Sequence, residues 1–281
     1  MNYKDITVGI VTFKSENVIL DCLKSIKYIK KIIIFDNSND IKTKKKIKKK
    51  YPNIKILLSK TNFGYGVANN KIIKRCKTKY LLILNPDTIL SKNCEIELLK
   101  SIKKLKGNFS IISPISNDKN YGFLKQNKKN SYKDFIEVDY VKGFAMLINI
   151  NKIKKAGMFD KNIFLYLEEI DLCKRLIKSG EKIFVITKAK INHLSAKSTN
   201  IGFEFEKCRN WHWMWSRYYY NKKHFGYFYA LKIVLPKIVL DFLKMIFFFP
   251  SNTNKSISYK YRLFGSMSGI FNLPSFFRPK M

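Results

Sequence analysis

The chain has 281 residues, of which 46% are hydrophobic, so it can build a sizeable core and is not an intrinsically disordered protein. Its 55 Lys and Arg against 20 Asp and Glu give a formal net charge of +35, which first suggests a nucleic acid or another anionic partner. Only six of the basic residues are Arg, whereas base readout and bidentate phosphate contacts favour the planar Arg fork, so we do not expect nucleic acid as a partner. Attraction to an anionic lipid surface remains an alternative.

The cysteines are scattered along the chain without a Cys-x-x-Cys pair, which argues against a zinc ribbon and a disulfide framework. They are Cys22, Cys76, Cys94, Cys173 and Cys208. Residues 1–11 include Asp5 and have no long apolar stretch, so no signal peptide is indicated. We expect a protein of the cytoplasm.

The first 90 residues or so alternate short β-branched runs with amphipathic segments, a pattern typical of βαβ units around a mainly parallel sheet flanked by helices. Strands are predicted at 6–11, 32–35, 54–58 and 80–84. Apolar residues at helical spacing predict a helix over 18–26, with Ser15 and Asn17 as candidate caps. The Lys-rich run 42–50 is interpreted as the solvated face of another helix.

Polar residues or glycines follow each predicted strand. Because parallel strands share a direction, these residues are expected to meet at one edge of the sheet, where α/β proteins bind nucleotides. Asp36 can accept from the imide N–H of a uracil or thymine ring, and the glycines let backbone approach a ligand. The residues concerned are Thr12, Asp36, Asn37, Asn62, Gly64, Gly66, Asn69, Asn70 and Asp87.

Two of these motifs are weak signals when taken alone. Gly64-x-Gly66 lacks the third glycine of the dinucleotide fingerprint and comes after the third strand, which argues against a Rossmann dehydrogenase. Asn85-Pro86-Asp87 taken alone is ordinary turn chemistry. Its place at the end of a buried strand nevertheless puts Asp87 where a metal-bound diphosphate would lie.

A cluster of carboxylates opens a predicted helix that ends near Gly180: Glu168, Glu169 and Asp171. Helix-dipole compensation and a surface pair between Asp171 and Arg175 explain one or two of them. The aromatic and apolar stretch 163–167 just before them would hold them at a buried edge, where one could act as a base. His193, beyond a strand predicted at 183–186, is either a structural histidine or a metal ligand.

From Phe203 the composition changes to aromatic and basic residues, including the run 211–220. After Pro236 a helical pattern puts Lys237, Asp241 and Lys244 on one face and apolar residues on the rest. This segment is too charged to span a membrane, and two interpretations remain equal: a helix lying in the membrane interface, or an extension packed on the preceding domain.

Several ordered blocks of the chain resemble glycosyltransferase family 2 enzymes of the GT-A fold, particularly the bacterial rhamnosyltransferase-like branch. The resemblance covers roughly residues 5–200 and rests on the blocks 8–13, 36–38, 62–64 with 69–70, 85–87, 141–144 and 168–173, together with His193 and Ser198. It implies an α/β, Rossmann-like GT-A catalytic domain at 1–202, with a nucleotide-binding half at 1–90 and an acceptor half at 91–202. A helical C-terminal extension would occupy 203–281.

The resemblance also implies roles for individual residues. Asp87 would bind Mg²⁺ or Mn²⁺ on the donor diphosphate, with His193 as second metal ligand, and Asp36 would contact the base. Glu169 would be the general base of an inverting transfer from a dTDP- or UDP-sugar, such as dTDP-rhamnose, to a lipid-linked surface glycan at the inner face of the membrane. Lys142, Gly143 and Phe144, with residues between Ser116 and Asp139, would shape the acceptor side.

The chain departs from the family pattern at two positions. Asn85 replaces an acidic residue in the metal motif, so metal binding would depend on Asp87 and His193. Glu169 stands where the family usually has Asp, which leaves Glu168 and Asp171 as alternative bases. The runner-up function is a non-catalytic basic protein, associated with a membrane or a nucleic acid, on a degenerate transferase fold; a nucleotidyltransferase is less favoured because residues 12–16 contain no glycine. The oligomeric state is left undetermined.

Overall fold

A computed structural model describes residues 2–116, 128–194 and 202–279 of the chain. These residues divide into two compact units. The first comprises residues 1–160 and 169–200, and the second residues 161–168 and 201–281. Ser198 and the acceptor-side residues 117–127 lie outside the described residues.

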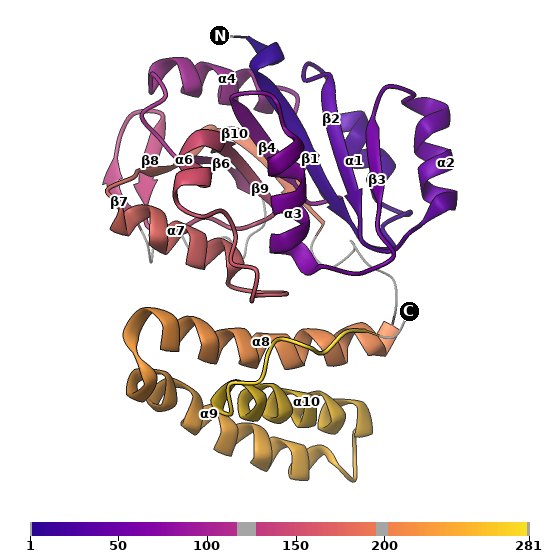
Figure 1. Cartoon of the computed structure of the whole chain (residues 1–281), viewed down its shortest axis with the longest axis vertical. Helices are drawn as coiled ribbons and strands as arrows, with labels where there is room; N and C mark the ends of the chain where they lie inside the picture. Colours follow the sequence, from indigo (N-terminus) through magenta and orange to yellow (C-terminus); the bar gives the residue numbers. More distant parts are fainter. Residues whose placement is uncertain (1, 117–127, 195–201, 280–281) are drawn as a thin grey trace. The chain divides into compact units, whose positions relative to one another are not determined.

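The first unit is a mixed α/β fold built on one sheet (Figure 1). Its strands are β1 (Ile6–Thr12), β2 (Lys31–Asp36), β3 (Lys55–Leu58), β4 (Tyr80–Leu84), β5 (Thr88–Leu90), β6 (Ile111–Ser116), β7 (Lys128–Ser131), β8 (Phe135–Val138), β9 (Ala145–Asn149) and β10 (Ile183–His193). Its helices are α1 (Ile19–Ser25), α2 (Ile41–Lys50), α3 (Gly64–Arg75), α4 (Cys94–Lys104), α6 (Ile150–Lys155) and α7 (Glu168–Lys178), and a short 3-10 turn, Tyr3–Asp5, precedes β1.

The strand order is β3-β2-β1-β4-β9-β6-β10-β8-β7, with β5 paired to the end of β10. The strands β3, β2, β1 and β4 run parallel to one another, as do β6 and β10. β9 lies between these two parallel groups and is antiparallel to both neighbours, β4 and β6. The parallel part of the sheet therefore brings the carboxyl ends of β1, β2 and β4 to one edge.

Alternating side chains divide the core into two layers, one on each face of the sheet. One layer joins α1, α2 and α4 to Val8, Leu82 and Leu147. The other joins α3, α6 and α7 to Leu81 and Ile148. Since adjacent residues of one strand enter opposite layers, β4 and β9 are buried on both faces, as expected of central strands covered by helices on both sides.

The four predicted strands are confirmed, and Tyr80–Leu84 matches residue for residue. The predicted caps of α1 are wrong: the helix begins after Val18, which makes no side-chain cap. The Ser15 hydroxyl instead bonds to the backbone of Phe13. The end of α7 at Gly180 is confirmed, since this glycine has a positive φ of 79° that closes the helix.

The second unit is helical, as predicted, and contains α8 (Gly202–Phe225), α9 (Tyr227–Phe248) and α10 (Thr253–Ile270). Asp241 belongs to the charged face that the sequence pattern groups on α9. This residue is 1% exposed, and its carboxylate lies 3.0 Å from Arg262 of α10. Within the described residues, no helix combines the length and apolarity that a membrane span requires.

Candidate active site

Asp36, at the carboxyl end of β2, is buried in a network of hydrogen bonds from the protein. Thr12 at the end of β1 donates its hydroxyl to one carboxylate oxygen at 2.7 Å. The backbone N–H groups of Ser38 and Asp40 donate to the other at 3.0 and 2.9 Å. These bonds join the carboxyl ends of β1 and β2 and fix the Asp36 carboxylate at this edge of the sheet.

The turn between β3 and α3 is held against the end of β2. Asn37 donates its amide to the carbonyl of Gly64 at 3.1 Å and accepts from the N–H of Phe63 at 3.1 Å. Asn62 accepts from the N–H of Gly64 at 2.9 Å. Gly64 has φ +75°, a conformation that favours glycine, so this residue is needed for the turn itself.

Asn69 and Asn70 of α3 differ in their surroundings. Asn69 is buried and donates to the carbonyl of Tyr65, while its amide oxygen has no hydrogen-bond partner among the described residues. Asn70 donates to the Phe159 carbonyl at 2.8 Å and accepts from the Phe159 N–H at 3.0 Å. Asn70 therefore ties α3 to the loop after α6, and the expectation that it faces the cleft is wrong.

Asp87 and His193 are brought together by strand pairing. β5 begins directly after Asp87 and pairs antiparallel with the end of β10, so that Thr88 lies opposite His193. The carbonyl of Asp87 accepts from the N–H of Leu194 at 3.0 Å. As a result, His193 Nε2 lies 3.4 Å from Asp87 Oδ1, although the two residues are far apart in the sequence.

This pair fits a divalent cation. Asp87 is 1% exposed, and its Oδ1 has no hydrogen-bond partner in the described part of the chain, which is costly for a buried carboxylate unless a cation or a ligand meets it. Two ligands about 2.1 Å from one ion are about 3 Å apart when adjacent, close to the separation observed. Among the described residues no group of three or more His, Cys, Asp or Glu gathers, and a cation held by this pair would take further ligands from water or substrate phosphate.

The segment 142–144, just before β9, connects several parts of the site. The Phe144 carbonyl accepts from the N–H of Asn85 at 2.9 Å, and the Phe144 ring stacks on His193 with centroids 4.7 Å apart. The Gly143 carbonyl accepts from the hydroxyl of Tyr65. A Cβ at Gly143 would lie 3.3 Å from that hydroxyl oxygen, so the close approach of Tyr65 favours glycine here.

Glu169 lies in the first turn of α7 and faces this same segment. Burial raises the pKa of the Glu169 carboxyl above its usual range. The backbone N–H groups of Glu169, Ile170 and Gly143 and the charge of Lys142 act in the opposite direction. A carboxylate with a raised pKa that is held by oriented N–H groups is suited to accept a proton.

The other two carboxylates of the cluster have different surroundings. Asp171 is fully buried and accepts from Arg175 Nε at 2.9 Å, while Arg175 also donates to the carbonyls of Ala156 and Met158. Asp171 thus belongs to a network that anchors α7 to the turn after α6. Glu168 is buried and begins α7.

Sequence reasoning gave no role to Tyr65 and did not anticipate the backbone conformation of Tyr166 and Leu167. Tyr65 contacts Gly143, and an aromatic residue inside the Gly-x-Gly turn was the available signal. Tyr166 and Leu167 have φ values of 69° and 66°, a strained conformation for residues other than glycine, immediately before the carboxylate cluster. Nothing in the local sequence indicates that strain.

The mostly parallel sheet with helices on both faces is the fold of the GT-A glycosyltransferases. The model of "Glycosyl transferase family 2" matches residues 7–165, more than half of the chain, and the chain belongs to this family.

Among curated relatives, the rhamnosyltransferase WbbL of Escherichia coli K12 is 27% identical over 212 residues, covering 65% of this chain and 78% of the relative. The N-acetylglucosaminyl-diphospho-decaprenol L-rhamnosyltransferase of Mycobacterium tuberculosis H37Rv is 20% identical over 210 residues, covering 60% and 67%.

Two solved structures share the fold at low sequence identity. The mannosyltransferase PcManGT from Pyrobaculum calidifontis, in complex with GDP-Man and Mn²⁺, has a TM-score of 0.60 at 10% identity, covering 95% of this chain and 87% of that chain. TarS 1–349 of S. aureus, in complex with UDP-GlcNAc, has a TM-score of 0.56 at 12% identity, covering 97% and 93%.

Proposed function

We propose that this chain is an inverting glycosyltransferase that moves a sugar from a nucleotide-diphosphate donor to a lipid-linked surface glycan at the inner face of the membrane. A dTDP- or UDP-sugar is the proposed donor class, and dTDP-rhamnose the specific candidate. Family membership and the rhamnosyltransferase names of two relatives support this proposal. The observation that carries it is the buried Asp87 Oδ1, which has no hydrogen-bond partner among the described residues and lies 3.4 Å from His193 Nε2 at the edge of the sheet.

The donor would lie along the ends of β1, β2 and β4. Its base would meet Asp36, with Thr12 holding that carboxylate in place. The next polar groups on this edge are the Asn62–Gly64 turn and the amide oxygen of Asn69, which has no hydrogen-bond partner in the described ranges. The diphosphate would lie at Asn85 and Asp87, where Mg²⁺ or Mn²⁺ held by Asp87 and His193 would neutralise the charge of the departing nucleotide diphosphate.

Glu169 is the proposed base. Its carboxylate removes the proton from an acceptor hydroxyl, and that oxygen forms a bond to the anomeric carbon as the bond from this carbon to the diphosphate oxygen breaks. Attack from the face opposite the leaving group inverts the anomeric configuration in one displacement. Lys142 and the N–H of Gly143 adjoin the carboxylate, so the segment 142–144 would position base and acceptor together.

The test is thermal stabilisation by UDP, dTDP and GDP, each with and without Mn²⁺, because a ligand that binds the native state raises its melting temperature. We expect one of the thymidine or uridine nucleotides to stabilise the wild type only with metal, and Asp87→Asn to lose that shift. Asp21→Asn, an exposed carboxylate on α1, is the matched control and should keep it.

A second measurement, release of nucleotide diphosphate from the corresponding donor sugar, connects binding to transfer. If no nucleotide stabilises the protein at saturating metal, or if Asp87→Asn shifts like the wild type, the donor site is wrong. A basic, non-catalytic protein would instead bind anions with a steep dependence on salt and would be indifferent to Asp87.

A further inference from the structure

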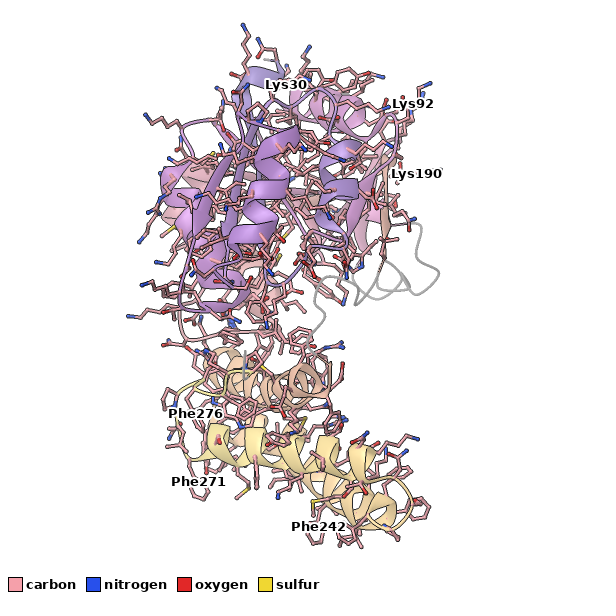
Figure 2. All side chains as sticks on the ribbon, turned by 90° about the vertical axis from the view of Figure 1, so that its right-hand side faces the viewer. Lys30, Lys92, Lys190, Phe242, Phe271 and Phe276 are labelled. Carbon is pink, nitrogen blue, oxygen red and sulfur yellow. The ribbon has the colours of Figure 1, made fainter. Side chains whose placement is uncertain are left out.

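The outward face of α9 is apolar. We define its outer stripe as six side chains that recur at helical spacing: Phe228, Leu235, Val239, Phe242, Leu243 and Ile246. Phe228 is 85% exposed and Val239 60%, and the other four are about half exposed. Figure 2 labels Phe242 of this stripe. A soluble helix normally shows the opposite polarity, with its apolar side chains turned to the core.

The inward face of the same helix carries the buried carboxylate of Asp241. Asp241 is buried and pairs with Arg262 of α10. Ala230 and Val234 are the fully buried apolar residues of α9, and they pack with Met214 and Tyr218 of α8. Leu231 and Ile238 also pack against this cluster, whereas the six residues of the outer stripe stay about half exposed or more, a large patch of the kind that marks a binding surface.

The charges around the stripe identify its partner. The helices α9 and α10 carry six basic residues, Lys232, Lys237, Lys244, Lys255, Lys260 and Arg262, against one acidic residue, Asp241. Because Asp241 is buried and paired, it offers no negative charge at the surface. Lys232 lies one helical turn after Phe228 and is exposed on the same face. Lys237 and Lys244 share the inward face with Asp241, so the exposed charge on the outer stripe is that of Lys232.

A second copy of this chain does not meet both requirements. In a symmetric dimer each copy presents the same surface, so Lys232 would face a surface with no acidic group to offset its charge. An anionic bilayer supplies the hydrocarbon for the apolar stripe and the negative headgroups for Lys232. Four charged residues within α9 also suit a helix that lies in the interface rather than one that crosses it.

We infer that α9 lies in the surface of an anionic membrane with its outer stripe, Phe228 to Ile246, in the lipid and Lys232 at the headgroups. This inference rests on the membrane location in the proposed function and specifies the helix that would meet the membrane, but it does not require the transfer reaction. Binding to vesicles needs no donor, and stabilisation by nucleotide needs no vesicle, so either proposal can fail without the other.

The experiment is co-sedimentation of the full-length protein with vesicles of phosphatidylcholine alone or mixed with phosphatidylglycerol, at low and high NaCl. We expect binding to the mixed vesicles that weakens with salt. The double variant Val239→Glu with Leu243→Glu should bind at least about tenfold more weakly, since two apolar residues leave the lipid and two negative charges replace them. Ile41→Glu, the same change at an exposed residue of α2, should bind like the wild type.

Charge is tested separately by Lys232→Glu, which should weaken binding about fivefold or more and flatten its salt dependence. Lys46→Glu on α2 removes the same net charge and should have little effect. Unchanged melting temperatures would establish that all variants fold. The inference is overturned if the wild type stays in the supernatant with mixed vesicles, or if Val239→Glu with Leu243→Glu sediments normally. It is also overturned if light scattering shows a lipid-free dimer that this double variant dissociates.

Discussion

Among the single residues, Glu169 is subject to two opposing demands: burial disfavours its ionised form, and the proposed role as a base requires that form. Its pKa is raised by burial, so at neutral pH the ionised form is less favourable in the folded chain than in water. The neutral side chain of Gln removes that cost. We therefore expect Glu169→Gln to melt at a higher temperature than the wild type at neutral pH, and the difference to shrink as pH falls and Glu169 becomes protonated. Calorimetry across pH measures this.

The same variant should lose about 10²- to 10⁴-fold in transfer rate, the usual contribution of a general base. In the wild type, kcat/KM should fall as pH drops through the raised pKa of Glu169. Lys142→Ala removes a charge that lowers this pKa and should move the acid limb to higher pH. Lys154→Ala, exposed on α6, is the control. An unmoved limb in Lys142→Ala would contradict the assignment of the limb to Glu169.

His212 of α8 should make the folded protein sensitive to acid. It is fully buried, with Nε2 2.7 Å from the Phe277 carbonyl, and burial lowers its pKa to about 3. The unfolded chain takes up this proton near the ordinary value of 6.5 while the folded chain does not. Stability is therefore present above pH 6.5 and is lost as pH falls from 6.5 towards 3, by at most about 1.4 kcal/mol per pH unit.

Urea unfolding monitored across this pH range checks that slope. His212→Gln keeps a donor for the Phe277 carbonyl but does not titrate, so its stability should fall less steeply with acid. His224→Gln, on the same helix, should retain the slope of the wild type. If His212→Gln loses stability as steeply as the wild type does, the acid sensitivity belongs to other groups.

Among the helices, α8 and α10 pack closely where Gly265 of α10 meets the backbone of Trp211 of α8. A Cβ at Gly265 would lie 2.0 Å from the backbone oxygen of Trp211, which cannot move away as a flexible side chain would. We expect Gly265→Ala to destabilise the helical unit by about 1–3 kcal/mol. Lys260→Ala, exposed on the same helix, should change stability by a few tenths at most. Denaturant midpoints distinguish the two, and equal midpoints would mean that the helices do not pack this closely.

The elements also show which parts of the structure local sequence can predict. Strands β1 to β4 and their polar ends were predictable because a buried parallel strand needs a continuous apolar run, and polar residues or glycines mark the point where that run ends. The antiparallel insertion of β9 and the pairing of β5 with β10 were not, because both depend on contacts between distant segments. The proximity of Asp87 and His193 results from that pairing, and only the family resemblance anticipated it.

The α9 helix illustrates a second limit. Periodicity correctly grouped Lys237, Asp241 and Lys244 on one face, yet it did not indicate that Asp241 would be buried. That outcome depends on Arg262, a residue of another helix that balances the buried carboxylate. A pattern within one helix specifies which residues share a face, whereas the choice of the buried face is made by its neighbours.

At the scale of the whole molecule, the charge of +35 opposes folding. With 55 basic and 20 acidic residues, most cations have no acidic partner, and their mutual repulsion is larger in the compact state than in the unfolded chain. Salt screens this repulsion over about 10 Å at 0.1 M. We therefore expect the melting temperature to rise with NaCl from low to physiological concentration and then to level off.

The contribution of this repulsion can be tested by reversing charges in α2, the most Lys-rich helix. Replacing Lys45, Lys46, Lys49 and Lys50 of α2 by Glu lowers the net charge at surface positions and leaves the buried Ile47 in place. This variant should be more stable than the wild type at low salt and should gain less from NaCl. A melting temperature that falls with NaCl in the wild type would show that attractive ion pairs, such as Lys152 with Glu181, outweigh the net repulsion.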